Sequence, residues 1–232
     1  MILGAFLRAL GQLGDPAFRR VLWLGLGLTL LLLAGVSAAF VTAIDWFVAD
    51  TLTLPWIGEV SGIDRVLGWG SLILMIGLSV VLMVPVAALF SGFFLETVAA
   101  AVEDRHYPDL PPAVPLTPGD ALASAAGLFG LLIAANLAGL IVLPFAGPLA
   151  PLVFWAVNGL LLGREYFDLA ASRRLGRVGA RDLRRANRGR LWLAGTLMAA
   201  PLSIPLVNLL VPVLGAATFT HIFHALNGTE RP

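Results

Sequence analysis

Four long runs without a charged residue constrain this chain more than any other feature. They cover residues 21–44, 66–95, 121–163 and 191–229. The first would be about 36 Å long as a helix, and the second is longer, so each exceeds a bilayer core of about 30 Å. Only 12% of the residues are charged, about half the usual share in soluble domains. The sequence therefore predicts an all-α integral membrane protein with a single membrane domain, residues 1–232.

We expect residues 21–95 to form two long transmembrane helices, with Pro85 bending the second. The loop between them, residues 45–65, holds four carboxylates and one arginine, and tryptophans flank it as in an interfacial aromatic belt. Apolar residues at helical spacing in residues 1–14 predict an N-terminal interfacial helix that is too short to span. A cleaved signal peptide is the alternative for this end, but the apolar run is too long for one.

The other two uncharged runs are broken by prolines and predict helical hairpins over residues 121–163 and 191–226. The prolines at the breaks are Pro144, Pro148 and Pro151 in the first run and Pro201, Pro205 and Pro212 in the second. One arm of each hairpin reaches only about 21–22 Å, so partial penetration of the membrane is expected. Full crossing, with six spans, would give the same sidedness. Because non-helical backbone at that depth must be covered by protein or water, we expect a homo-oligomer built from dimers.

Two charged segments separate the apolar parts of the chain. Residues 96–120 are acidic, begin as a helix and end in a proline-rich loop. Residues 164–190 hold nine arginines against three carboxylates. An excess of arginine marks the cytoplasmic side, and residues 1–20 and the C-terminus are expected there too. Arg173 and Arg174 have no feature that sets them apart within the basic segment.

The stretch directly before the first uncharged run has the features of an anion-binding helix start. Asp15 suits the N-cap, and Pro16 suits the first helical position. The free amides that follow point outward at the positive end of the helix dipole, and Arg19 and Arg20 add two guanidinium groups. The simpler alternative is that the two arginines only hold the helix end at the cytoplasmic surface.

The same four residues, Ala17-Phe18-Arg19-Arg20, resemble the helix start of the CysZ family of bacterial sulfate permeases. The family has Gly-Leu-Arg-Arg there, so Ala17 stands in place of glycine and Phe18 in place of leucine. The resemblance, together with the helix-start pattern, makes Ala17, Phe18, Arg19 and Arg20 the expected sulfate-binding residues.

Further stretches carry the same resemblance over nearly the whole chain. Leu89–Glu96 is similar to the family's Pro-Phe-Asn stretch, and Gly163–Asp168 and Ile204–Ala217 are similar to its later segments. The resemblance implies sulfate uptake across the bacterial inner membrane, feeding cysteine synthesis. It also implies a multi-pass homo-oligomer with two crossing helices and two partly penetrating hairpins, in contact with sulfate and membrane lipids.

The remaining polar residues have structural explanations. Glu96 and Glu103 are expected on a cytoplasmic helix surface, paired with arginines. His221 and His224 share a helix face but lack further metal ligands, so a wet or interfacial position is expected. The three asparagines within the apolar runs are expected to hydrogen bond between helices. They are Asn136, Asn158 and Asn208.

Composition excludes several classes of function. The chain has no cysteine, so disulfides, thiolate metal sites and cysteine nucleophiles are excluded. The motifs of zinc proteases, serine hydrolases and phosphate loops are missing, so the sequence predicts no enzyme, no metal and no cofactor. The net charge of +1 predicts no nucleic-acid partner. The alternative to transport is a scaffold or regulator that binds anionic lipid or a partner protein through residues 164–190.

Overall fold

The computed structural model describes the chain except for residues 48–52, 55–57, 60–94, 114–117, 209 and 229–232. The chain divides into two compact units, one of residues 1–22 with 92–232 and one of residues 23–91. The regular secondary structure of the described residues is helical apart from one short antiparallel pair of strands, β1 (Thr53–Leu54) and β2 (Gly58–Glu59). The predicted all-α class is confirmed for them. The second predicted crossing helix, with Pro85, lies outside the described residues but for its end at Leu95.

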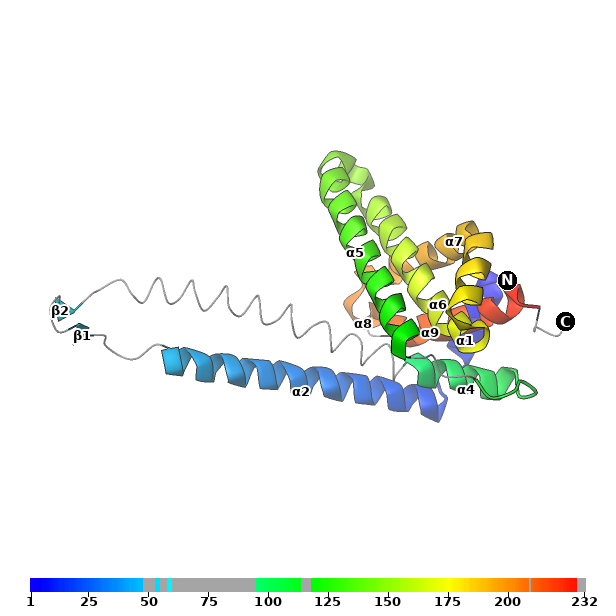
Figure 1. The fold of residues 1–232 in the computed structure, drawn as a ribbon, viewed down its shortest axis with the longest axis horizontal. Helices are drawn as coiled ribbons and strands as arrows, with labels where there is room; N and C mark the ends of the chain where they lie inside the picture. The colour runs from blue at the N-terminus through cyan, green and yellow to red at the C-terminus, as the bar shows by residue number, and fades with distance from the viewer. Residues whose placement is uncertain (48–52, 55–57, 60–94, 114–117, 209, 229–232) are drawn as a thin grey trace. The chain divides into compact units, whose positions relative to one another are not determined.

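The helices follow the expected order along the chain (Figure 1). They are α1 (Ile2–Gly11), α2 (Pro16–Phe47), α4 (Glu96–His106), α5 (Pro118–Ala146), η2 (Gly147–Leu149), α6 (Ala150–Ala186), α7 (Arg188–Ala199), η3 (Ala200–Ser203), α8 (Pro205–Asn208) and α9 (Val211–Leu226). Short α1 corresponds to the expected N-terminal helix, and α4 to the start of the acidic segment.

The predicted first hairpin is formed by α5 and the beginning of α6 (Figure 1). Its turn is η2, where Gly147 has a φ of +48° that favours glycine. Pro144 lies inside α5, and Pro151 lies in the first turn of α6, where a missing N–H leaves no helical bond unmade. Beyond the uncharged run, α6 continues through the basic segment to Ala186.

A bend at Gly176 divides α6 into two arms. Its φ of 66° and ψ of 178° belong to a region that side chains with a Cβ rarely adopt. The arm after the bend folds back so that Arg184 reaches Asp168 of the arm before it. The bend therefore gathers basic side chains that a straight helix would spread along its length.

Glycines allow α7 to pack closely along α6. A Cβ on Gly195 would lie 2.0 Å from the carbonyl oxygen of Gly159, and one on Gly163 would lie 2.5 Å from that of Leu191. Gly159 and Gly163 are four residues apart, the small-residue spacing that lets two helix backbones approach in membrane proteins.

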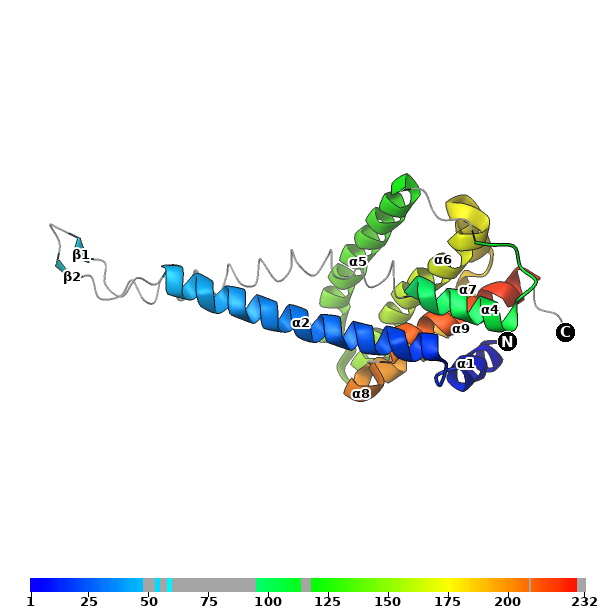
Figure 2. The same ribbon diagram turned by 90° about the horizontal axis from the view of Figure 1, so that it is seen from below.

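The predicted second hairpin is formed by α7, η3, α8 and α9, with its break at Pro201 and Pro205. α9 is buried almost throughout and packs against α1, α4 and α6, as Figure 2 shows for the neighbouring α1 and α4. The largest fully buried side chains of the core are four phenylalanines, Phe18, Phe167, Phe219 and Phe223.

Among the described residues, two stretches are long and apolar enough to cross a membrane, Pro16–Val36 in α2 and Ala126–Ala186, which contains the α5–α6 hairpin. Only 19% and 11% of their most apolar windows are buried within the molecule. Large side chains such as Leu140 and Phe145 are exposed on α5. A core helix of a soluble protein buries most of its apolar surface, so lipid is the solvent that suits these two stretches.

Candidate functional site

The predicted anion site is the start of α2, and Asp15 caps this helix as the sequence predicted. Oδ1 of Asp15 accepts a hydrogen bond from the Ala17 amide at 2.9 Å. The amide of Arg19 donates to the carbonyl oxygen of Asp15 at 3.0 Å. Two of the amides expected to face an anion therefore have partners within the helix start, and the side chain of Phe18 is fully buried in the core.

The basic side chains at this helix start are open to solvent. Arg19 and Arg20 are both exposed on the first turn of α2. Nη1 of Arg105 on α4 lies 3.7 Å from Oδ2 of Asp15. The start of α2 thus presents positive charge through its side chains, rather than through the amides of Ala17 and Arg19.

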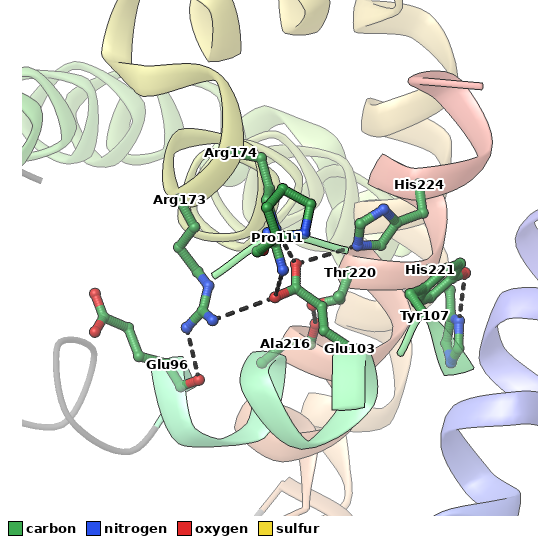
Figure 3. A network of polar contacts seen from close by, with 10 residues as sticks. All are labelled: Glu96, Glu103, Tyr107, Pro111, Arg173, Arg174, Ala216, Thr220, His221 and His224. Atoms are coloured by element: carbon green, nitrogen blue, oxygen red, sulfur yellow. Dashed lines mark hydrogen bonds and ion pairs between the residues drawn. The ribbon is translucent and has the colours of Figure 1, made fainter. Parts of the chain in front are cut away.

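A buried ionic cluster joins α4, α6 and α9, and we call Glu103, Arg173, Arg174 and His224 the Glu103 cluster (Figure 3). Arg174 binds both carboxylate oxygens of Glu103, at 3.0 Å from Nε and 2.7 Å from Nη2. Nη2 of Arg173 lies 3.3 Å from Oε2, and Nε2 of His224 lies 3.1 Å from Oε1. Glu103 is only 4% exposed.

These contacts hold Glu103 in its ionised form. Burial by itself raises the pKa of Glu103. Hydrogen bonds from His224 and Arg174 and the charges of the two arginines outweigh this effect and lower the pKa to about 2. The arginines also bind carbonyl oxygens, Arg173 that of Glu96 at 3.0 Å and Arg174 that of Pro111.

The structure corrects two expectations about this region. Glu103 pairs with arginines as predicted, but it lies in the core and not on a helix surface, because α6 and α9 cover it. Arg173 and Arg174 are its core partners and are therefore distinct from the rest of the basic segment. Sequence spacing gave no sign of this, because Glu103 and Arg174 are 71 residues apart.

The expectation of a wet or interfacial position for the two histidines is wrong. His221 and His224 are 0% and 1% exposed, because α9 lies at the centre of the core. The Tyr107 hydroxyl lies 3.0 Å from Nδ1 of His221, and its ring stacks on His224 with centroids 4.0 Å apart (Figure 3). Within the described parts of the chain, no three metal-ligating side chains come together.

Two of the asparagines also differ from expectation. The side-chain amides of Asn136 and Asn158 each donate to the carbonyl oxygen four residues earlier in their own helices, at 2.8 Å. The hydrogen bonds that the structure describes for this pair are therefore made within a helix rather than between helices. Bonding within the helix satisfies a donor on a helix surrounded by apolar groups without a partner from outside.

A second group of arginines surrounds a cavity of about 290 Å³ between α5 and the two arms of α6, which we call the arginine pocket. Its walls on α5 include Ala123 and Gly127, and on α6 they include Ser172. Among the described residues that line it, Asp168 is the sole acidic one. The arginines are Arg164, Arg177, Arg181, Arg184 and Arg185.

Asp168 ties the two arms of α6 together at this pocket. Its Oδ1 lies 2.8 Å from Nε of Arg184, and its Oδ2 lies 3.7 Å from Nε of Arg164. Nη2 of Arg177 reaches the carbonyl oxygen of Ala123 at 3.5 Å. The sequence predicted a basic segment here but no pocket, because the bend at Gly176 decides which arginines meet.

With this geometry in view, the comparison with known families is informative. The profile of the family described as "Sulfate transporter CysZ/Etoposide-induced protein 2.4" matches residues 5–212. The chain belongs to this family. The match confirms the resemblance to CysZ seen in the sequence motifs, and it extends from α1 to the first residues of α9. No curated protein matches the chain.

The CysZ family is one of membrane-associated transporters rather than enzymes. This agrees with the exposed apolar surfaces of the two stretches able to cross a membrane. In the described part of the chain, the start of α2 and the arginine pocket are places where several arginines lie close together.

Proposed function

We propose that this member of the CysZ family is a sulfate permease that takes up sulfate across the bacterial inner membrane for cysteine synthesis. The observation that carries the proposal is the exposed pair Arg19 and Arg20 on the first turn of an apolar helix long enough to cross a membrane, in a chain of this family. Sulfate is a strongly hydrated dianion, and entering lipid without partners is prohibitive. A protein must replace its water with hydrogen-bond donors and positive charge.

The start of α2 supplies both requirements. Arg19 and Arg20 donate charge-assisted hydrogen bonds to sulfate, and the positive end of the helix dipole adds to the attraction. Asp15 is the competing anion there, because its carboxylate already holds the Ala17 amide. Arg105, 3.7 Å from Asp15, gives that carboxylate another partner when sulfate arrives.

The proposal includes a homo-oligomer built from symmetric dimers in contact with lipid. The exposed apolar side chains of α5 and the turn at η2 support it, since both need a covering of lipid or protein. A monomeric mass in mild detergent and in lipid, across protein concentrations, would contradict this part.

The test is uptake of radiolabelled sulfate by liposomes that contain the purified full-length protein. Arg19→Ala with Arg20→Ala should weaken sulfate binding by on the order of tenfold or more for each arginine, since a hydrogen bond to a charged group contributes about 1.5–3 kcal/mol. Lysines at both positions should rescue only in part, because lysine lacks the planar fork.

The matched control is Arg188→Ala with Arg190→Ala, which removes two exposed arginines of the basic segment. Arg173 and Arg174 are unsuitable as controls, because they hold Glu103 in the core. Normal uptake by a well-assembled Arg19→Ala, Arg20→Ala variant would reduce the two arginines to membrane anchors. A wild type with no flux above protein-free liposomes would favour the scaffold or regulator instead.

A further inference from the structure

We infer that the arginine pocket is a binding site for a tetrahedral oxyanion with at least two unesterified oxygens, separate from the start of α2. The chemical class is that of free sulfate or of the phosphate group of an anionic lipid. The choice of sulfate as the free ion rests on the proposed function, whereas the existence of the site does not.

Charge is the first argument for this site. Asp168 neutralises part of the charge of Arg184 and Arg164, but Arg181 and Arg185 have no carboxylate partner among the described residues. Positive groups that face one cavity repel each other, and an anion between them replaces part of that repulsion with attraction. Several acceptor oxygens on one ion can serve several guanidinium groups at once.

The size of the cavity is the second argument. A volume of about 290 Å³ is many times the roughly 30 Å³ that one water molecule occupies in the liquid, so a tetrahedral anion fits with part of its hydration shell. The wall on α5 is made of small residues that keep the space open. A Cβ on Gly127 would already lie 2.9 Å from Nη2 of Arg164.

Preorganisation is the third argument. Asp168 holds Arg184 and Arg164, and the carbonyl oxygen of Ala123 holds Arg177, before any ligand arrives. Side chains that are already ordered lose less conformational entropy on binding. The planar fork of arginine suits the paired oxygens of sulfate and phosphate better than a lysine ammonium does.

The experiment measures binding of radiolabelled sulfate to purified full-length protein in nanodiscs of phosphatidylcholine at constant ionic strength. Arg181→Gln with Arg185→Gln removes two pocket arginines that tie no element together, and Arg188→Gln with Arg190→Gln is the matched control. The wild type and the control should bind two sulfates per chain. The pocket variant should lose about tenfold or more in affinity per arginine at one site and keep the site at Arg19 and Arg20.

A second variant keeps every charge in place. Gly127→Leu puts a side chain into the pocket wall, whereas Gly130→Leu on the same helix meets open space, with no atom within 4 Å of its Cβ. Gly127→Leu should lose the pocket sulfate, and Gly130→Leu should keep it. Oligomer size and thermal unfolding are checked for all four variants.

Nanodiscs with added phosphatidylglycerol separate the two sources of the oxyanion. If this lipid displaces the pocket sulfate in the wild type, the group that occupies the pocket is the lipid phosphate. Added phosphatidylglycerol should then raise the thermal unfolding midpoint of the wild type and the controls but not that of the pocket variants. Equal binding of both sulfate and phosphatidylglycerol by the pocket variants and their controls would overturn the inference. If the protein binds sulfate through the pocket arginines but gives no sulfate flux, the proposed function is wrong and the pocket site stands. If sulfate flux is normal but binding does not depend on the pocket arginines, the pocket site is wrong and the proposed function stands.

Discussion

The Glu103 cluster and the arginine pocket are both built from arginines of α6, and they differ in charge balance. In the Glu103 cluster, two arginines that are each 14% exposed share one buried carboxylate with a histidine. In the arginine pocket, five arginines line a cavity whose described walls hold one carboxylate, which is 30% exposed and pairs with only two of them. An arginine whose N–H donors are directed at a buried carboxylate therefore stabilises the fold. Where arginines outnumber the carboxylates around them, some of their donors remain available to bind a ligand.

Removing the carboxylate of the Glu103 cluster should have the largest effect. Glu103→Gln leaves Arg173 and Arg174 buried without a counter-charge, and losing one partner of a buried ionic group costs about 3–5 kcal/mol. The measurement is the midpoint of thermal unfolding in detergent, monitored by circular dichroism. Asp104→Asn changes the exposed neighbouring carboxylate and should leave the midpoint almost unchanged. Equal stability of the two variants would show that the cluster does not hold α4 in place.

Acid should break the same cluster without a mutation. The pKa of Glu103 is about 2 in the folded protein, below the ordinary value of 4.5, so its contribution to stability is complete above about pH 4.5 and is lost as the pH falls toward 2. The unfolding midpoint should therefore drop more steeply over this range in the wild type than in Glu103→Gln. Parallel curves would mean that other carboxylates govern the acid response.

A change at the bend should separate the two regions. Gly176→Ala places a Cβ where φ is +66°, which strains the backbone by about 1–3 kcal/mol or straightens α6. Sulfate binding to the arginine pocket should be lost, while the Glu103 cluster, formed before the bend, should persist. Gly189→Ala, at a position with open space around its Cβ, is the control. Retained pocket binding in Gly176→Ala would show that the bend is not needed to assemble the pocket.

The change with the smallest expected effect should increase the affinity of the arginine pocket for sulfate rather than abolish binding. Asp168→Asn removes the competing negative charge but keeps an amide oxygen that can still accept hydrogen bonds from Arg184 and Arg164, so sulfate should bind the pocket several-fold more tightly. The cost in stability should stay within about 1 kcal/mol, as for other partly exposed ion pairs. Isothermal titration with sulfate measures the change, and Asp182→Asn, which does not line the pocket, is the control. Weaker binding would mean that Asp168 positions the arginines more than it competes with the anion.

Features that depend on neighbours in the sequence could be predicted without the structure. Asp15 and Pro16 mark the start of α2, because capping and the missing proline N–H act within one helical turn. The prolines near residues 147 and 205 mark the breaks of the two hairpins for the same local reason. The motifs around Arg19 and Arg20 indicated the CysZ family, and the match over residues 5–212 confirms it.

The roles of the individual arginines were decided by tertiary structure alone. Arg174 and Arg181 are alike in sequence and lie in the same basic segment, but Arg174 meets Glu103 from 71 residues away, whereas Arg181 lines a cavity. The burial of His221 likewise depends on α1, α4 and α6 packing around α9. The charge state and availability of a side chain depend on what surrounds it in space, and packing brings those partners from distant parts of the chain.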